Sequence, residues 1–218
     1  MNSSQTATLI LQATWETILM VVTSTVFAVV IGLPIGVFAF LTSPRSLRPN
    51  RLAHRVLDVV INVGRSLPFI ILLVLILPLT RLITGTTIGP VAAIVPLTLA
   101  AAPFFARLVE TSLREIPKGK IDAGEVLGAS LPQLIWHVLL PEALPGLVSG
   151  ITVTFVSLIG YSAMAGAIGG GGLGDVAIRY GYQRYQWDIT VWTVVVLLGL
   201  TMLVQWLGDR MSWALAHR

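Results

Sequence analysis

The sequence contains no cysteine and few charged residues. Only 11% of its 218 residues are Asp, Glu, Lys or Arg, whereas an average soluble domain has roughly 25%. The lack of cysteine excludes disulfides and thiol chemistry. Because 55% of the residues are hydrophobic and the mean hydropathy is +0.86, we expect an integral membrane protein. Its length allows about five or six spans of roughly 20 residues each, without a sizeable soluble domain.

Motifs for phosphate binding, metal binding and nucleophilic catalysis are also missing. The glycines at 169–174 have no preceding strand and no following Lys, and the sequence has no GxxxxGK[ST], so we expect a flexible external turn. His54, His137 and His217 lie far apart and lack the HExxH spacing of a zinc site. We therefore expect no catalytic residue, metal or cofactor in this chain.

Acidic residues are absent from the middle of every predicted span, which argues against a proton- or sodium-coupled transporter and against an enzyme acting within the bilayer. The 14 Lys and Arg residues are spread over membrane-flanking loops rather than gathered in one patch, so nucleic-acid binding is not expected. Residues 1–14 carry no Lys or Arg, so they do not resemble the start of a cleaved signal peptide, and we expect the N-terminus to stay on the mature protein.

Charge-free runs predict five membrane spans. The first covers about 17–41, and its Gly-Leu-Pro-Ile-Gly sequence at 32–36 predicts a kink or close helix packing. The second is expected as one helix over about 57–79, which places Arg65 inside the span. Two roles for Arg65 are open, one in a pore and one as a side chain that reaches back to the lipid headgroups.

The other three spans are expected at about 88–107, 147–168 and 189–208. Ten of the 14 Lys and Arg residues fall on one side, including Arg45 in the first loop and Arg218 in the tail, three fall on the other side, and Arg65 lies within a span. By the positive-inside rule the richer side is cytoplasmic. The sequence thus predicts an all-α bundle of five transmembrane helices with its N-terminus outside and its C-terminus inside.

Residues 118–141 lie between the third and fourth spans and are neither a span nor a simple turn. Pro117 can open a short helix, and Gly128 can close it. Small side chains at the bend would allow another surface to approach closely. These small residues are Ala123, Gly124, Gly128 and Ala129.

A second short helix is predicted directly after this bend. Ser130 and Gln133 have the spacing of a capping box, and Pro141 is expected to end the helix. An apolar stripe follows the helical repeat. It consists of Leu131, Leu134, Ile135, Val138 and Leu139. The pattern predicts a helix-turn-helix element at the cytoplasmic membrane surface, which either binds a partner or rests its apolar stripe on lipid.

This element resembles a known family signature. The sequence DAG-x3-G-x9-V-x-LP from Asp122 to Pro141 resembles the EAA-x3-G-x9-I-x-LP signature of bacterial ABC importer permeases. It departs from that pattern in Asp122 for Glu, Gly124 for Ala and Val138 for Ile. The stretches 61–73, 87–110, 139–150 and 158–175 are similar to the methionine-importing branch of this family, whose permeases have five spans.

The resemblance implies the type I ABC importer transmembrane fold, in one domain over 1–218, located in the bacterial inner membrane. It implies that two copies form the translocation path, that coupling helices at about 118–136 dock on two cytoplasmic ATP-binding subunits, and that a lipid-anchored extracytoplasmic protein delivers methionine. The residues that match the signature, and those beside them, would carry the coupling. They are Asp122, Ala123, Gly124, Glu125, Gly128, Ala129, Val138, Leu140 and Pro141.

For the path we single out Tyr161, Ser162 and Met164, because a polar-tipped ring and an adaptable thioether among small residues suit a gate that opens and reseals. Ordinary helix packing is the alternative for each of them. Three other functions are also open: a permease for a different small amino acid, a homo-oligomeric channel that needs no ATP, and a membrane scaffold without transport.

Overall fold

The structure is a computed structural model that describes residues 3–44 and 46–216. This part of the chain is helical throughout except for short turns, and it contains no strand. Arg45 and Arg218, which contribute to the charge-based topology, and His217 lie outside the described residues.

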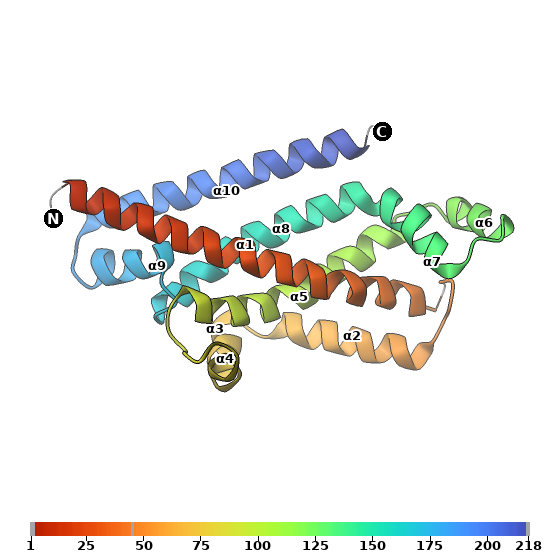
Figure 1. Ribbon diagram of the computed structural model, residues 1–218, viewed down its shortest axis with the longest axis horizontal. Helices are drawn as coiled ribbons and strands as arrows, with labels where there is room; N and C mark the ends of the chain where they lie inside the picture. Colours follow the sequence, from red (N-terminus) through yellow and green to blue (C-terminus); the bar gives the residue numbers. More distant parts are fainter. Residues whose placement is uncertain (1–2, 45, 217–218) are drawn as a thin grey trace.

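Five long helices run lengthwise through the molecule (Figure 1). They are α1 (Ser3–Thr42), α2 (Arg51–Ser66), α5 (Pro90–Arg114), α8 (Leu140–Ala167) and α10 (Trp187–Ala216). The short helices are α3 (Phe69–Leu75), α4 (Leu77–Thr84), α6 (Lys118–Val126), α7 (Leu131–Leu134) and α9 (Gly172–Val176). Two π-helical turns, η1 (Ile135–Leu139) and η2 (Ala177–Tyr182), precede α8 and follow α9.

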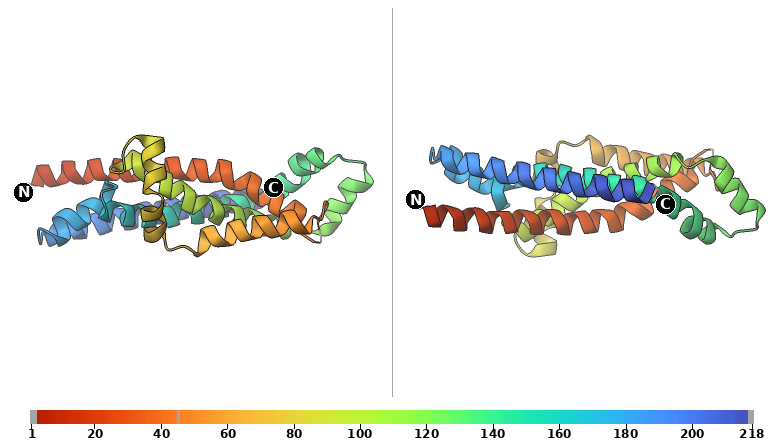
Figure 2. Two further views of the ribbon diagram at one scale, coloured as in Figure 1. Left: turned by 90° about the horizontal axis from the view of Figure 1, so that it is seen from below. Right: turned by 90° about the horizontal axis from the view of Figure 1, so that it is seen from above.

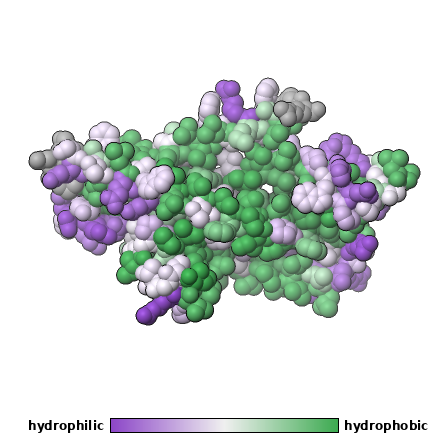
Figure 3. Space-filling model, viewed as in Figure 1, coloured by the Kyte–Doolittle hydropathy of each residue, from purple (hydrophilic) through white to green (hydrophobic). Residues whose placement is uncertain are grey.

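Four stretches of the described chain are long and apolar enough to cross a membrane. They are Ser4–Thr42, Pro90–Arg114, Leu131–Ala167 and Trp187–Ala216. The bent pair α2–α3 brings the number to five if it counts as one span. Figure 3 shows hydrophobic residues across the middle of the molecule and hydrophilic residues at its two ends. The assignment of these ends to the two sides of the membrane stays a prediction from the charge distribution.

The second span differs from the expected single helix over 57–79. α2 ends at Ser66, the chain is extended at Leu67 and Pro68, and α3 continues at an angle of 104° to α2. The physical reason is Pro68, which has no N–H for a continuing helix and pushes the preceding residue out of the helical region. Arg65 therefore lies in the last turn of α2 rather than inside a straight span.

The core forms where α5 packs against α1 and α8. Met20 of α1, Leu97 of α5 and Leu158 of α8 are fully buried in one cluster. A second cluster, around Phe105 and Leu139, lies nearer to α6 and α7. α5 also contacts α2, α3 and α4, so it is the central helix of the bundle.

Close packing, rather than a break, explains the glycines of α1. The helix continues through Pro34. A Cβ added at Gly32 would lie 2.7 Å from the carbonyl oxygen of Ala102 in α5, and one at Gly36 would collide with Ala106 and Val109. These two glycines thus let the backbones of α1 and α5 approach each other, as small residues do between membrane helices.

We predict that Gly36→Ala lowers the thermal stability of the detergent-purified protein. The added methyl group has no space against α5, and overpacking of this kind costs about 1–3 kcal/mol. The matched control is Gly199→Ala on α10, where an added Cβ meets nothing within 4 Å and removal of a helix glycine gains about 0.5–1 kcal/mol. Equal melting temperatures for the two variants, measured by loss of the monodisperse peak after heating, would contradict the packing argument.

Candidate functional site

The element formed by α6, the following turn and α7 projects beyond the ends of the long helices (Figure 2). Pro117 is the residue before α6, and the helix ends at Val126. Gly128 then adopts φ +76°. Its N–H donates to the Glu125 carbonyl at 2.9 Å, and the N–H of Ala129 donates to the Gly124 carbonyl at 3.1 Å. This pair of bonds is the Schellman motif, which favours glycine at the left-handed position, so the predicted end of the first helix is confirmed.

The second short helix also begins as predicted. A capping box is present at Ser130 and Gln133, and the Ser130 N–H donates to Oε1 of Gln133 at 2.8 Å. The predicted end at Pro141 is wrong, because the chain stays helical from α7 through η1 into α8. The N–H of Leu140 donates to the Ile135 carbonyl, which is π-helical spacing. Pro141 then lies in the first turn of α8, where a missing N–H is tolerated.

The apolar stripe packs on the bundle rather than on lipid. Leu139 is buried in the cluster around Phe105, and Leu134 is also buried, at 3% exposure. Leu131 and Ile135 pack on the same cluster. Of the other signature residues in this segment, Val138 and Leu140 are half-buried and Pro141 is exposed. The alternative in which the stripe floats on the membrane surface is therefore wrong for this structure.

Gly124 shows why a smaller residue replaces the alanine of the family signature. A Cβ at this position would lie 2.5 Å from Cδ2 of Leu134. The glycine therefore lets α6 lie closely against α7. Ala129 is half-buried in the turn, whereas Asp122, Ala123 and Glu125 are exposed.

The tip of the element carries the most exposed apolar side chains of this region. Val126 is 87% exposed and Leu127 is 86% exposed. No residue of α6 is buried. Lys120 does not belong to this free surface, because its Nζ lies 2.6 Å from Oε2 of Glu142 and so ties α6 to α8. An apolar tip flanked by the carboxylates of Asp122 and Glu125 is a surface on which a second protein can dock.

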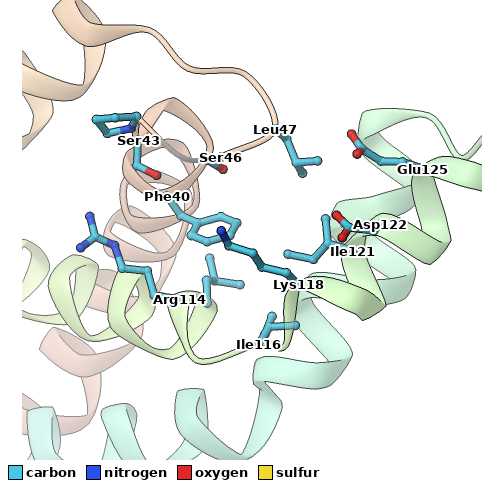
Figure 4. Close-up of a pocket in the computed structure, with 12 residues that line it drawn as sticks. Phe40, Ser43, Ser46, Leu47, Arg114, Ile116, Lys118, Ile121, Asp122 and Glu125 are labelled. Atoms are coloured by element: carbon cyan, nitrogen blue, oxygen red, sulfur yellow. The ribbon is translucent and has the colours of Figure 1, made fainter.

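A cavity of about 920 Å³ separates α6 from the ends of α1 and α5 (Figure 4). Phe40 and Ile121 form apolar parts of its lining, and Lys118 points into it. Asp122 and Glu125 line the α6 side. α6 is held to the bundle through Ile121, through the Gly124–Leu134 contact and through Lys120, and the cavity leaves room beside these contacts.

The residues expected in a path lie at a different part of the bundle. The ring of Tyr161 stacks on Phe69 of α3, with centroids 4.8 Å apart and planes at 6°. Met164, one turn further along α8, is 49% exposed. Ser162 is buried, and its hydroxyl donates to the Ile159 carbonyl at 2.8 Å. Arg65 is exposed, and its guanidinium carbon lies 6.0 Å from the ring centroid of Phe104. The structure thus brings Tyr161 and Phe69 together, whereas the ring beside Arg65 is that of Phe104 in α5.

The glycine stretch 169–174 is partly helical and its backbone is bonded, in contrast to the expected flexible turn. α9 begins at Gly172, whose N–H donates to Oε2 of Glu16 at 2.8 Å. The N–H of Leu173 donates to Oγ1 of Thr17 at 2.9 Å. Sequence reasoning missed Glu16 and Thr17, because their partners lie 156 positions away in the chain.

Sequence reasoning also missed a group of charges on α2 and α5. Arg107 binds Asp58 of α2 and Glu110 of its own helix, and Arg114 binds the same Glu110. The spacing of Arg107, Glu110 and Arg114 places them on one face of α5, which is the signal that could have revealed these pairs. The link to Asp58 has no local signal.

Comparison with known proteins shows one family over most of the chain. The family model described as "Binding-protein-dependent transport system inner membrane component" matches residues 28–213. A probable D-methionine transport system permease protein of Vibrio cholerae is 49% identical over 96% of this chain and 93% of that protein. A protein of Pasteurella multocida with the same description is 51% identical over 94% of this chain and 95% of its own length.

Solved structures give the same result for the fold. A chain from the inward-facing conformations of the MetNI methionine ABC transporter is 47% identical, covers 99% of both chains and superposes with a TM-score of 0.96. The crystal structure of an amino acid ABC transporter with histidines has a TM-score of 0.79 at 17% identity and supports the fold alone. The predicted all-α membrane bundle of the type I importer fold is confirmed.

We predict that Gly128→Ala loosens the turn between α6 and α7. An alanine in the left-handed region costs roughly 1–2 kcal/mol, so limited proteolysis within residues 118–130 should be about fivefold faster. Gly119→Ala is the control, because Gly119 lies inside α6 and an added Cβ there meets nothing within 4 Å. Cleavage of Gly128→Ala at the rate of the unmodified chain would show that the left-handed turn is not required.

Proposed function

Because the chain belongs to the family of binding-protein-dependent transport system inner membrane components, we propose that it is the membrane-spanning permease of an ATP-driven importer of methionine. The L- and D-enantiomers are both candidate substrates, since the related proteins are described as D-methionine permeases. The chain itself is not an enzyme.

The observation that carries this proposal is the projecting α6–α7 element with its exposed tip at Val126 and Leu127. The sequence holds no nucleotide-binding motif, so the energy for transport must come from a partner. A rigid short helix pair with an apolar tip suits insertion into a groove of a cytoplasmic ATP-binding subunit. Asp122, Ala123 and Glu125 are exposed beside the tip and would contact that groove.

The complete transporter would contain two copies of this chain and two ATP-binding subunits in the bacterial inner membrane. An extracytoplasmic methionine-binding lipoprotein would deliver the substrate at the end opposite α6 and α7. Of the signature residues, Gly124, Gly128 and Ala129 would shape the element rather than contact the partner. Val138, Leu140 and Pro141 belong to the continuous helix that anchors it.

We predict that Leu127→Asp abolishes co-purification of the permease with its ATP-binding subunit. Leu127 makes no buried contact within the chain, so the fold should be unaffected, whereas a charge at a docking tip should cost at least roughly 2 kcal/mol, about thirtyfold in affinity. The control is Leu52→Asp, a change at another exposed leucine, 73% exposed, in the first turn of α2, where a carboxylate is favourable.

Uptake of labelled methionine into proteoliposomes completes this test. The assembled wild-type transporter should import only with ATP and the binding protein, and Leu127→Asp should import nothing. Uptake that needs no ATP would instead indicate a homo-oligomeric channel. ATP-driven import of another small amino acid in preference to methionine would show that methionine is not the main substrate.

The gate is the second part of the proposal. We place the closure of the path at Tyr161 and Met164 of α8. The Tyr161 ring is held by Phe69, and the Met164 side chain, one helical turn further along, is half-exposed. Ser162 would support the helix from its buried side. Arg65 would lie at the end of α2 that is farther from the cytoplasmic loop, close to the break before Phe69.

We predict that Met164→Ala raises basal ATP hydrolysis, measured without substrate and binding protein, by about fivefold, since a truncated gate loses about 1 kcal/mol of closed-state contact. Met202→Ala is the matched control, because Met202 lies on α10 and is 68% exposed. Basal hydrolysis and methionine leak at wild-type levels in Met164→Ala would remove this residue from the gate.

A further inference from the structure

Five polar residues form a connected group between α2 and α5, which we call the Arg107 cluster: Asp58, Asn62, Arg107, Glu110 and Arg114. The Arg107 guanidinium donates to Oδ1 of Asp58 at 2.6 Å, to Oδ1 of Asn62 at 2.9 Å and to Oε2 of Glu110 at 2.7 Å. Arg114 donates to the other oxygen of Glu110. Asn62 in turn donates to Oδ2 of Asp58 at 3.1 Å.

Arg107 is the member that joins the two helices. Its partners Asp58 and Asn62 belong to α2, whereas Glu110 and Arg114 belong to α5. Glu110 is only 1% exposed, so its charge depends on the two arginines. Asp58 is 41% exposed, which makes it the position where the link can be cut without burying an unpaired charge.

The cluster lies directly before α6. Arg114 is the last residue of α5, and only Glu115, Ile116 and Pro117 separate it from Lys118. A backbone hydrogen bond closes a turn on each side of this three-residue connection, from Ile116 to Leu113 at the end of α5 and from Lys120 to Pro117 at the start of α6. A displacement of α6 therefore acts on the segment of α5 that holds the cluster.

Apolar packing reinforces the same contact between α2 and α5. Ile61 of α2 is fully buried with Ala106 of α5, and a Cβ at Gly64 would lie 2.6 Å from Cγ of Pro103. Beyond Ser66 the chain bends by 104° into α3. α3 no longer follows α2, since Phe69 stacks on Tyr161 of α8.

We propose that the Arg107 cluster is the joint through which a movement of α6 reaches α2, and that Asp58 and Arg107 are its positioning residues. α2 and the end of α5 then move as one body, and the break at Leu67 and Pro68 is the hinge that passes the movement to the Phe69–Tyr161 stack. This inference rests on the proposed function, because it concerns how ATP-driven movement reaches the gate.

The arrangement of contacts favours a permanent joint over a latch that opens in each cycle. The Arg107 guanidinium donates to the two carboxylates at 2.6 and 2.7 Å and to the Asn62 amide oxygen at 2.9 Å, and the glycine–proline contact beside it has no spare space. A guanidinium that bridges three oxygen-bearing side chains also fixes orientation, which a single ammonium cannot do.

The test compares Asp58→Asn with wild type in the complete transporter, reconstituted with its ATP-binding subunits and binding protein. Asp58→Asn should lower the methionine imported per ATP hydrolysed by about fivefold, while ATP hydrolysis itself continues. Asp58→Glu should recover most of this ratio. Asp209→Asn, on the exposed end of α10, is the matched control and should keep the wild-type ratio.

A conformational measurement separates a joint from a residue that only stabilises the fold. On ATP binding, hydrogen exchange should change in peptides from both α6 and α2 of the wild type, but only in α6 of Asp58→Asn. An unchanged import ratio, or an α2 that responds equally in both proteins, overturns the joint. Failure of the wild type to import with ATP would instead overturn the proposed function, and the exchange comparison would still decide whether α2 follows α6.

Discussion

The backbone contact between α1 and α5 is the constraint on which the rest of the bundle depends. Gly32 and Gly36 remove the side chains that would keep the two helices apart, and α5 then becomes the surface on which α2, α3, α4 and α8 pack. In a membrane, apolar side chains gain little by leaving lipid, so helices associate through close fit. The glycines therefore supply stabilisation that hydrophobic burial alone would not.

Much of the fold follows from local sequence signals. The short helix pair was predictable because Gly128, Ser130 and Gln133 act on their own neighbours through the left-handed cap and the capping box. The spans were predictable because charge-free runs of bilayer length allow few alternatives. Helix ends were less predictable: α1 continues back to Ser3 and α10 on to Ala216, since helical hydrogen bonding does not stop at the edge of the apolar run.

Features that depend on partners distant in the chain could not be read from the sequence. The break at Pro68 was missed when one helix was expected over 57–79, and the direction of α3 goes with the stack of Phe69 on Tyr161, a residue far away in the chain. Arg107 was visible only as one of several basic residues, because its pairing with Asp58 depends on how α2 lies on α5. The expected helix end at Pro141 was wrong, because the chain stays helical through a π-helical turn directly before this residue.

The distribution of contacts along the bundle separates two mechanical roles. In the part of the chain that the structure describes, the ion pairs lie toward the ends of the long helices, with Arg107 and Lys120 near α6 and Asp175 with Arg179 at the opposite end. Between them the helices touch mainly through glycine, alanine and larger apolar side chains, with few directional bonds such as that from the Ser24 hydroxyl to the Ile94 carbonyl. Helices that pack mainly by shape in the middle of the bundle can shift past one another. The α6–α7 element, which would receive the force, stays fixed to α8 through the ion pair of Lys120 with Glu142. Under the proposed function, this division would let a push on α6 reach the region of Tyr161.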